Sequence, residues 1–351
     1  MDSTAQQDLR ERHQALVAET PNLRIRERAR RLGVPEAALV ALDQGVKAKR
    51  LRCVPHEIFP KLGGLGRIMC LTRNASCVHE RYGQFEDVQV SPKMGLVLGP
   101  DIDLRLFFDQ WATAWEVEDG GRRSLQFFDR FGEAVHKIYR TDDTDAAAWD
   151  ALVNEFAAPE DEAAAMPDFE PLPPSVSDHG EDLDAAGRQA LRDEWLGMTD
   201  PHQFFPLLQK LKLSRITAIR NAGSDLAQKV SNDTVEQVLN AVSASGLPIM
   251  VFVGSRGTVQ IHGGPVEKLM RTGPWFNVLD PKFNLHLDTT AIASSWVVHK
   301  PTDDGPVTSL ELFADNGDLI AQFFGLRKPG IPELKDWRAL MVKQCSEPLH
   351  D

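Results

Sequence analysis

Asp101-Ile-Asp-Leu-Arg-Leu-Phe-Phe108 alternates along its whole length between two kinds of side chain. In an extended strand, successive side chains point to opposite faces, so the apolar and polar positions separate into Ile102, Leu104, Leu106 and Phe108 against Asp103, Arg105 and Phe107. Similar strand-like segments surround it between residues 68 and 128, joined by short turn-rich connections. The pattern predicts a broad antiparallel sheet with one face in a core.

The second half of the chain repeats the first at a fixed offset of 181 residues, which becomes 185 after a small insertion. The matches include Ile68-Met69 with Ile249-Met250, Val97-Leu98 with Val278-Leu279, Leu104 and Leu106 with Leu285 and Leu287, Trp115 with Trp296, and Ser124-Leu125 with Ser309-Leu310. We therefore predict an α+β fold built by tandem duplication. Each half is a large antiparallel β-sheet flanked by helices, and a cleft between the halves is the expected ligand site.

Helices are expected before each sheet, at residues 9–19, 23–32 and 36–42 and again at 186–191, 201–213 and 233–243. Between the two sets, residues 157–184 are rich in proline, alanine and acidic side chains, which is typical of an exposed linker. The predicted organisation is an N-terminal repeat at 1–156, a linker at 157–184 and a C-terminal repeat at 185–351.

The formal charge of −12 is concentrated in residues 141–187, which hold fourteen acidic and no basic residues. The remainder carries 39 basic and 37 acidic residues, which leaves room for a basic ligand site but argues against a nucleic-acid partner.

No apolar run is long enough to span a membrane, and the first residues lack the apolar core of a signal peptide. We expect a cytoplasmic chain without membrane insertion. Its four cysteines form no Cys-x-x-Cys pair.

The segment Asp200-Pro-His-Gln203 specifies a helix start with a histidine in its first turn. Asp200 is a good N-cap, Pro201 suits the first helical position, and Gln203 completes a capping box. His202 lies away from the apolar stripe of Phe204, Leu207, Leu208 and Leu211. The positive end of the helix dipole opposes protonation of its ring, so a lone pair stays free for a metal such as haem iron. A solvated capping residue is the commoner role for such a histidine.

Arg105 and Phe107 point the same way, and a guanidinium beside an aromatic ring suits a flat, apolar ligand that carries anions. A solvated sheet face is the alternative.

The chain as a whole resembles the HemS/ChuS/PhuS family of bacterial cytoplasmic haem-binding proteins. The segments that carry the resemblance are Leu71-Thr-Arg-Asn, Val78-His-Glu-Arg, Met94-Gly-Leu-Val-Leu, Asp101-Ile-Asp-Leu-Arg-Leu-Phe, Met198-Thr-Asp-Pro-His-Gln-Phe-Phe, Leu226-Ala-Gln-Lys-Val-Ser-Asn, Ile249-Met-Val-Phe-Val-Gly-Ser-Arg-Gly, Lys300-Pro-Thr and Thr308-Ser-Leu-Glu-Leu-Phe-Ala.

The resemblance implies one b-type haem held between the halves. By that resemblance His202 is the axial iron ligand and Arg105 the distal residue, which would be catalytic if the protein is an enzyme. Phe107 and Phe252 would line the porphyrin, and Arg215, Lys300 and Arg327 would lie near its propionates or at the mouth of the cleft. Phe324 stands where the family often has tyrosine, which predicts the loss of one hydroxyl from the pocket. His286 and His299 are alternative ligands of lower rank.

Two functions follow from haem binding. The first is a carrier that accepts imported haem, at the cytoplasmic side of an importer, and delivers it to a downstream haem oxygenase or another acceptor. The second is a haem-degrading enzyme, which cleaves the ring with oxygen and electrons from a separate reductase. The sequence contains neither a flavin nor a nicotinamide fingerprint. It does not separate the two functions, and the carrier is placed first.

Overall fold

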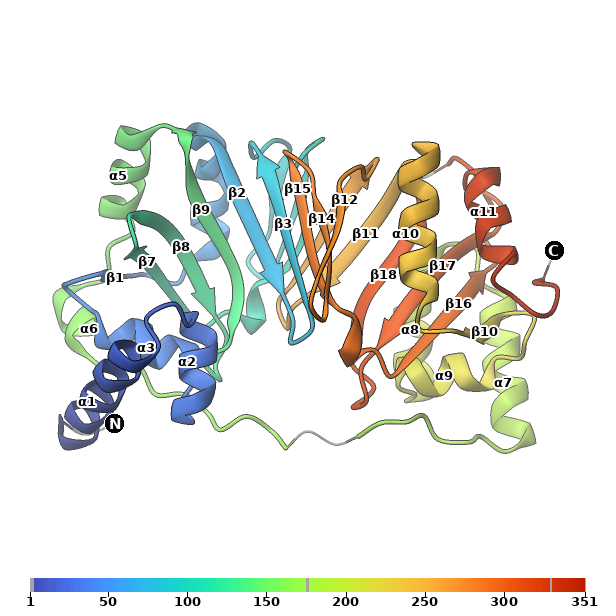
Figure 1. Cartoon of the computed structure of the whole chain (residues 1–351), viewed down its shortest axis with the longest axis horizontal. Helices are drawn as coiled ribbons and strands as arrows, with labels where there is room; N and C mark the ends of the chain where they lie inside the picture. Colours follow the sequence, from blue (N-terminus) through green and yellow to red (C-terminus); the bar gives the residue numbers. More distant parts are fainter. Residues whose placement is uncertain (1–2, 175–176, 329, 351) are drawn as a thin grey trace. The chain divides into compact units, whose positions relative to one another are not determined.

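The computed structural model describes residues 3–174, 177–328 and 330–350 and divides the chain into two compact units (Figure 1). Unit 1 comprises Met1–Arg73, Glu80–Pro173 and Ser255–Gln260, and unit 2 comprises Asn74–His79, Pro174–Gly254 and Ile261–Asp351. Each unit therefore contains a short segment from the opposite half of the chain. In unit 1 this segment is fixed by hydrogen bonds from Trp111 Nε1 to Gly257 O and from Thr72 Oγ1 to Gln260 Oε1, at 3.0 and 2.9 Å.

Unit 1 begins with three helices and continues into a sheet. Its elements are α1 (Ser3–Glu19), α2 (Ile25–Leu32), α3 (Glu36–Leu42), β1 (Ala48–Leu51), α4 (Pro55–Ile58), the 3-10 helix η1 (Phe59–Leu65), β2 (Gly66–Arg73), β3 (Cys77–Gly83), which begins in unit 2, β4 (Val88–Val90), β5 (Met94–Leu98), β6 (Asp103–Phe107), η2 (Phe108–Gln110), β7 (Thr113–Asp119), β8 (Arg122–Phe128), β9 (Ala134–Thr144), α5 (Ala146–Glu155) and α6 (Glu160–Ala164).

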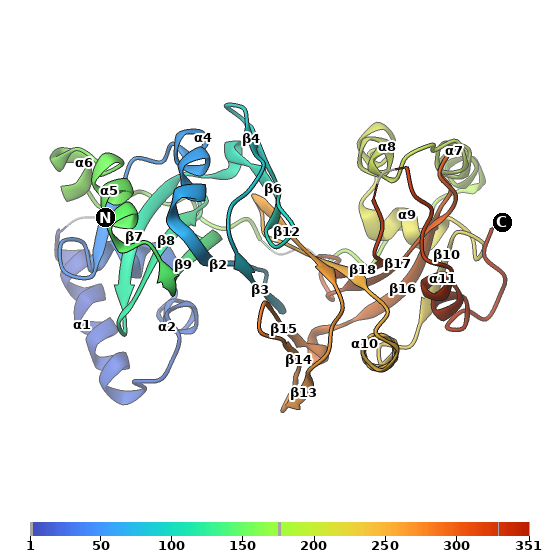
Figure 2. The same ribbon diagram turned by 90° about the horizontal axis from the view of Figure 1, so that it is seen from above.

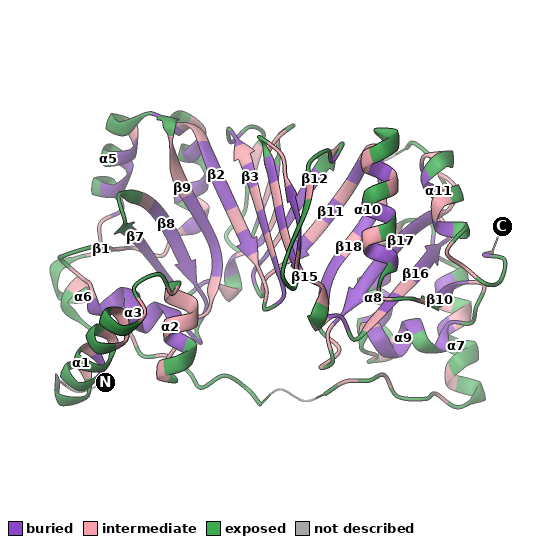
Figure 3. Ribbon diagram, in the orientation of Figure 1, coloured by how far each residue is buried: buried purple, intermediate pink, exposed green. Residues whose placement is uncertain are grey.

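The strands of unit 1 pair antiparallel in the orders β1-β7-β8-β9-β2 and β4-β5-β6. β6 has the alternation predicted for it, since Ile102, Leu104 and Leu106 are fully buried while Arg105 and Phe107 are half-buried. The buried side chains of β2, β8 and β9 pack with η1 and α5, whereas α1, α2 and α3 form separate small clusters. Figure 3 shows α1 exposed along most of its length.

Unit 2 repeats this order of elements. They are α7 (Ala185–Leu196), η3 (Pro201–Gln203), α8 (Phe204–Leu211), α9 (Arg215–Asn221), β10 (Ala227–Val230), α10 (Thr234–Ser245), β11 (Ile249–Gly254), β12 (Thr258–Gly264), which begins in unit 1, β13 (Leu269–Thr272), β14 (Trp275–Leu279), β15 (Phe283–Asp288), η4 (Thr289–Ala291), β16 (Ser294–Lys300), β17 (Val307–Phe313), β18 (Leu319–Gly325) and α11 (Lys335–Val342).

The strand orders β10-β16-β17-β18-β11 and β13-β14-β15 reproduce those of unit 1 strand for strand. The register is also the same, because Trp115 faces Gln126 in unit 1 and its counterpart Trp296 faces Glu311 in unit 2. These pairings confirm the tandem duplication and the α+β fold. Consecutive strands pair within β7-β8-β9 and β4-β5-β6, whereas β1 and β2 join the sheet through long-range pairings with β7 and β9.

The sheet of unit 2 separates two layers of helices (Figure 2). On one face, Val251, Leu310 and Phe323 pack with α10 and α11 around Val238 and Trp337. On the other face, α7, α8 and α9 pack on Val298 and Phe313. α8 follows directly from the turn that carries His202, so this second face is the one on which that turn is built.

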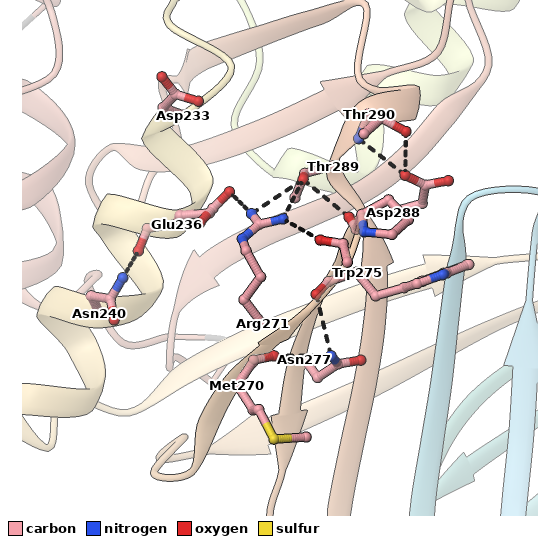
Figure 4. Close-up of polar contacts among 12 residues, drawn as sticks. Asp233, Glu236, Asn240, Met270, Arg271, Trp275, Asn277, Asp288, Thr289 and Thr290 are labelled. Carbon is pink, nitrogen blue, oxygen red and sulfur yellow. Dashed lines mark hydrogen bonds and ion pairs between the residues drawn. The ribbon is translucent and has the colours of Figure 1, made fainter.

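The hairpins β13-β14-β15 are joined to α10 by one arginine (Figure 4). Arg271 forms an ion pair with Glu236 of α10 and lies 3.3 Å from Thr289 Oγ1. Asn277 Nδ2 donates to Met270 O at 2.9 Å, and Asn277 Oδ1 accepts from the Nδ1–H of His286 at 2.7 Å. Strand and helix of unit 2 are thus connected through polar contacts as well as through the core.

Each unit contains an ion pair between the first residue of a helix and a buried charged side chain of the sheet. In unit 1 the first residue of α3, Glu36, pairs with Lys137 of β9. In unit 2 the first residue of α9, Arg215, pairs with Glu311 of β17 at 2.7 Å. Because removal of one member of a buried pair leaves an uncompensated charge, both contacts fix a helix to its sheet.

Residues 157–184, the predicted linker, contain ordered structure in their first part. α6 forms there, and Arg50 Nη1 donates to Ala165 O at 3.0 Å. Met166 and Phe169 pack against the small clusters beside α1 and α3. Two apolar side chains in an acidic, proline-rich segment are enough to anchor it to the unit. The contact units divide within this segment, between Pro173 and Pro174.

Buried neutral histidines make both units sensitive to acid. Burial lowers the pKa of His136 from 6.5 to about 3, and burial together with Arg338 lowers the pKa of His299 to about 4. As pH falls, these histidines take up protons at a higher pH in the unfolded chain than in the folded one. The stability that the neutral rings allow is therefore complete above pH 6.5 and is lost progressively as pH falls toward 4 for His299 and 3 for His136. We expect the free energy of unfolding to fall by up to about 1.4 kcal/mol per pH unit for each ring.

Urea unfolding between pH 7 and pH 5 measures this slope, and His136→Gln, which keeps a polar group beside Thr72, should reduce it. The Nδ1 atom of His136 lies 2.9 Å from Thr72 Oγ1. An unchanged slope in this variant would contradict the assignment of acid sensitivity to His136.

Candidate functional site

The turn that carries His202 is built as its sequence predicts. Asp200 accepts a hydrogen bond from the backbone N–H of His202 at 2.7 Å, and Gln203 Oε1 accepts from the backbone N–H of Asp200 at 3.2 Å. The capping box is complete, with Pro201 at the first position of η3. The predicted single helix is instead η3 followed by α8, which ends at Lys212 in a left-handed conformation, φ 56°.

Asp200 has a second role, which sequence reasoning missed. Its Oδ1 atom lies 2.6 Å from Nδ1 of His202, while the His202 side chain is 82% exposed. Burial tends to raise the pKa of Asp200, but these two hydrogen bonds from His202, with Arg327 nearby, lower it. A carboxylate on Nδ1–H fixes the tautomer that leaves Nε2 with its lone pair, which is the usual arrangement of metal-binding histidines.

Phe204 anchors this turn to the sheet. Its ring packs edge-on against Trp195 at 4.6 Å between centroids, and Trp195 Nε1 donates to His299 O of β16 at 2.9 Å. The same ring contacts two cations, with Arg215 and Lys300 at 4.8 and 4.7 Å from the centroid. His202 therefore projects from a turn that is fixed in place by the buried ring of Phe204, two residues later.

Arg215 and Lys300 lie together because both contact Glu311, a partner that the sequence did not reveal. The fully buried carboxylate of Glu311 accepts two hydrogen bonds from Arg215, each 2.7 Å long, and one from Lys300 at 3.2 Å. Gln322 Nε2 and Ser309 Oγ also donate to it, at 2.9 and 3.0 Å. Both cations thus already have a carboxylate partner within the chain, and their position near a ligand's propionates stays a prediction.

This network keeps one positive charge in excess. Burial opposes ionisation of Glu311, yet Arg215 and Lys300 hold its pKa far below the usual range. Burial and the neighbouring Arg215 lower the pKa of Lys300 to about 8, against the opposing effect of Glu311. At neutral pH two cations thus face one carboxylate. Such a surplus favours an anionic group nearby.

A strip of half-buried apolar side chains runs along the same sheet face. Cross-strand pairs place Phe252 opposite Gln322 and Gln322 opposite Glu311, so these three side chains share a face. Met250 is opposite Phe324 in the same way, and the rings of Phe252 and Phe324 meet edge-on at 5.0 Å. Apolar side chains left half open beside buried cations suit a flat ligand with carboxylates at its edge.

Arg327 follows β18 and lies close to the His202 turn. The backbone N–H of Asp303 donates to Thr199 O at 2.9 Å, and neighbouring Asp304 lies 3.7 Å from Arg327 Nη2. The Arg327 side chain is only 11% exposed, and its Nε–H has no hydrogen-bond partner within the described residues. An unsatisfied buried donor of this kind is a place where a ligand's acceptor would be stabilised.

Arg105 and Phe107 are residues of unit 1, on the half-buried face of β6. The Arg105 guanidinium forms an ion pair with Asp103, two residues earlier, and donates to Leu104 O at 3.3 Å. Burial raises the pKa of Asp103 although Arg105 acts in the opposite direction. The alternation in the sequence predicts that Arg105 and Phe107 share a face of the strand. Asp103 is on that face too, so the same pattern could have predicted its pairing with Arg105.

The two alternative histidines are held elsewhere in unit 2. His286 of β15 is half-buried, with Nδ1 on Asn277. His299 is fully buried, and its Nδ1 lies 3.1 Å from Arg338 Nη1 on α11. It is adjacent in β16 to Lys300 and therefore points to the opposite face of the sheet. Neither ring belongs to the turn, network and strip just described.

Comparison with known proteins places this chain in a family. The profile of the haemin-degrading HemS.ChuX domain matches residues 33–156 and 212–343. The chain belongs to this HemS.ChuX family. The two matched segments correspond to the two repeats, and His202 lies between them. The match therefore supports the duplicated fold directly, whereas the role of His202 rests on the geometry of its turn.

Three relatives cover nearly the whole chain. The hemin transport protein HmuS of Yersinia pestis is 42% identical over 333 residues, which is 93% of this chain and 94% of HmuS. The haem-binding protein PhuS of Pseudomonas aeruginosa, in its apo structure, is 46% identical with a TM-score of 0.90 over 96% of this chain and 98% of PhuS. The haem-degrading enzyme ChuS of Escherichia coli O157:H7 is 38% identical with a TM-score of 0.88 over 97% and 99%.

Among the described residues, no helix is long and apolar enough to cross a membrane.

Proposed function

We propose that this protein binds haem for haem uptake and utilisation, receiving imported haem and passing it on. The observation that carries the proposal is the His202 turn. An exposed imidazole is held on Nδ1 by Asp200, so that Nε2 is free, on the sheet face that also carries an apolar strip and a surplus of positive charge. The names of HmuS, PhuS and ChuS supply the chemical class of the ligand.

The residues of unit 2 fit haem in four respects. His202 would ligate the iron through Nε2, and Phe252 and Phe324 would lie against the porphyrin ring. Arg327, with its unsatisfied Nε–H, would bind a propionate, and the excess charge of the Arg215–Lys300–Glu311 network would favour the second. A b-type haem, held without covalent links, agrees with the absence of Cys-x-x-Cys-His from the sequence.

Unit 1 would contribute Arg105 and Phe107. Arg105 is proposed as the distal residue and Phe107 as a ring contact. Since Asp103 already holds the guanidinium, Arg105→Ala should remove a directed donor without removing an iron ligand. We expect this variant to change hemin affinity by less than about tenfold and to alter azide or cyanide binding to the loaded protein more strongly. A loss of hemin affinity as large as that of His202→Ala would contradict this role.

Degradation is the second candidate, because ChuS is described as a haem-degrading enzyme. Bound haem supplies an iron that activates oxygen when an external donor reduces it. The chain's own part would be to hold the porphyrin, orient the His202 ring through Asp200 and present Arg105 as a hydrogen-bond donor. We propose a cytoplasmic location, with an importer's cytoplasmic side as haem source and a haem oxygenase as acceptor.

A transfer experiment separates the two functions. The hemin complex is mixed with excess apomyoglobin, and in parallel with ascorbate and catalase under air, since catalase removes the peroxide that degrades haem unspecifically. A carrier gives holomyoglobin with its haem intact and no iron release. Formation of biliverdin with released iron in the second mixture, faster than transfer in the first, would instead establish the enzyme.

A further inference from the structure

Unit 1 contains a pocket that the proposed function does not use. Its volume is about 500 Å³, within the range of small-molecule sites. It lies where the ends of β2, β3, β8 and β9 meet, and its lining is Met69, Tyr82, Gly121, Arg122, Arg123, Tyr139, Arg140, Thr141 and Asp142. All of these residues belong to unit 1.

The pocket carries positive charge that the protein does not neutralise. Arg123 is engaged by Glu116 and Asp150, at 2.5 and 2.6 Å. By contrast, the guanidinium groups of Arg122 and Arg140 form no ion pair or hydrogen bond within the part of the chain that the structure describes. Asp142 is the one carboxylate in the lining. Two unpaired guanidiniums at one pocket favour an anion, which each can bind in bidentate fashion.

Aromatic and sulfur groups provide a second kind of contact in the same pocket. Met69 is almost fully buried beneath it, and Met69 and Tyr139 are directly opposite each other on β2 and β9. Tyr82 is half-buried, with Arg67 on its ring at 5.8 Å. Thioether and phenol groups pack well on a flat ring, and the hydroxyls can donate to an anion.

Comparison of the two repeats shows that the fold does not require these side chains. The same register places Met250 opposite Phe324 in unit 2, so the methionine is retained while Tyr139 corresponds to Phe324. At the repeat offsets, Tyr82, Arg122 and Arg140 correspond to Gly263, Val307 and Gly325. Unit 2 therefore builds equivalent strands without counterparts to Arg122 and Arg140 and without either tyrosine. Their presence in unit 1 calls for a role other than folding.

We propose that this pocket of unit 1 binds a small planar organic anion, with its carboxylate or phosphate between Arg122 and Arg140 and its ring against Met69, Tyr82 and Tyr139. The site is separate from the residues assigned to haem, and no part of the inference depends on haem binding.

Titration calorimetry at low ionic strength with phenyl phosphate, benzoate and neutral phenol tests the proposal. We expect phenyl phosphate or benzoate to bind with one-to-one stoichiometry, the better of the two identifying the anion, and phenol to bind at least about tenfold more weakly. The double variant Arg122→Val, Arg140→Ala should lose at least about tenfold in affinity for the anion. Tyr139→Phe, which introduces the residue of the other repeat, should lose less.

Arg24→Ala is the matched control, because it removes an exposed arginine of unit 1 outside the pocket. It should leave binding unchanged, and so should His202→Ala, which separates this site from haem. In protein labelled with 13C at its methionine methyls, the Met69 signal should shift on addition of the anion. The proposal is overturned if neither anion binds, or if binding is as strong in the double variant as in Arg24→Ala.

Discussion

His202→Ala is expected to weaken hemin binding by roughly 100-fold or more, because it removes the proposed coordinate bond to the iron. Loss of a residue that only orients a metal ligand costs about 10- to 100-fold in metal affinity, and the ligand itself should cost more. The Soret band of any residual complex should shift as well. Hemin titration followed by absorbance, with affinity obtained by competition against apomyoglobin, measures both effects.

Two further variants make this result specific. Asp200→Asn keeps a good N-cap but removes the negative charge from His202 Nδ1, so a loss of about tenfold is expected. His179→Ala removes another exposed histidine of unit 2, which lies 3.9 Å from the Asp315 carboxylate, and should have no effect. Equal affinities for His202→Ala and His179→Ala would exclude His202 as the ligand.

Glu311→Gln is expected to destabilise unit 2 by about 3–5 kcal/mol, the usual cost of leaving a buried charge without its partner. The amide keeps the shape of the side chain and can still accept hydrogen bonds. It cannot balance the buried Lys300 and the half-buried Arg215, which both contact the Phe204 ring. The effect should reach the His202 turn, since Phe204 anchors that turn to the sheet.

Hydrogen–deuterium exchange in increasing urea, read from peptides of β16, β17 and β18, reports this loss in unit 2 alone. Asp225→Asn provides the comparison, because Asp225 pairs with Arg192 at 2.7 Å in a partly exposed position. Its loss should cost at most about 1 kcal/mol. If both variants lose the same small amount, Glu311 does not hold the network together.

Much of the fold could be predicted because it depends on local alternation and on the repeat. The alternation at β6 and the matched pairs at offsets 181 and 185 are visible without any structure. β9 was missed although it is the longest strand described, because His136 and Lys137 interrupt its apolar pattern. Both are buried, and Lys137 is stabilised by Glu36, which is 101 residues away. Local patterns do not contain such a contact.

The candidate site, too, could be predicted only where it depends on residues close together in the sequence. The capping box at Asp200 and Gln203 is local and is confirmed, whereas the contact between Asp200 and the His202 ring needed coordinates. Glu311 lies between Leu310 and Leu312 and reads as the outward side chain of a half-exposed strand. It is fully buried because Arg215, 96 residues earlier, reaches it from α9. The roles of Arg105, Phe107, Phe252, Phe324 and Arg327 toward haem stay predictions.

The iron ligand is identified most directly by electron–nuclear double resonance of the hemin-loaded protein, prepared with 15N-labelled histidine. We predict strong coupling from one imidazole nitrogen, retained in His286→Ala and His299→Ala and lost in His202→Ala. Strong 15N coupling that persists in His202→Ala, or its absence from the unaltered protein, would contradict the proposed site.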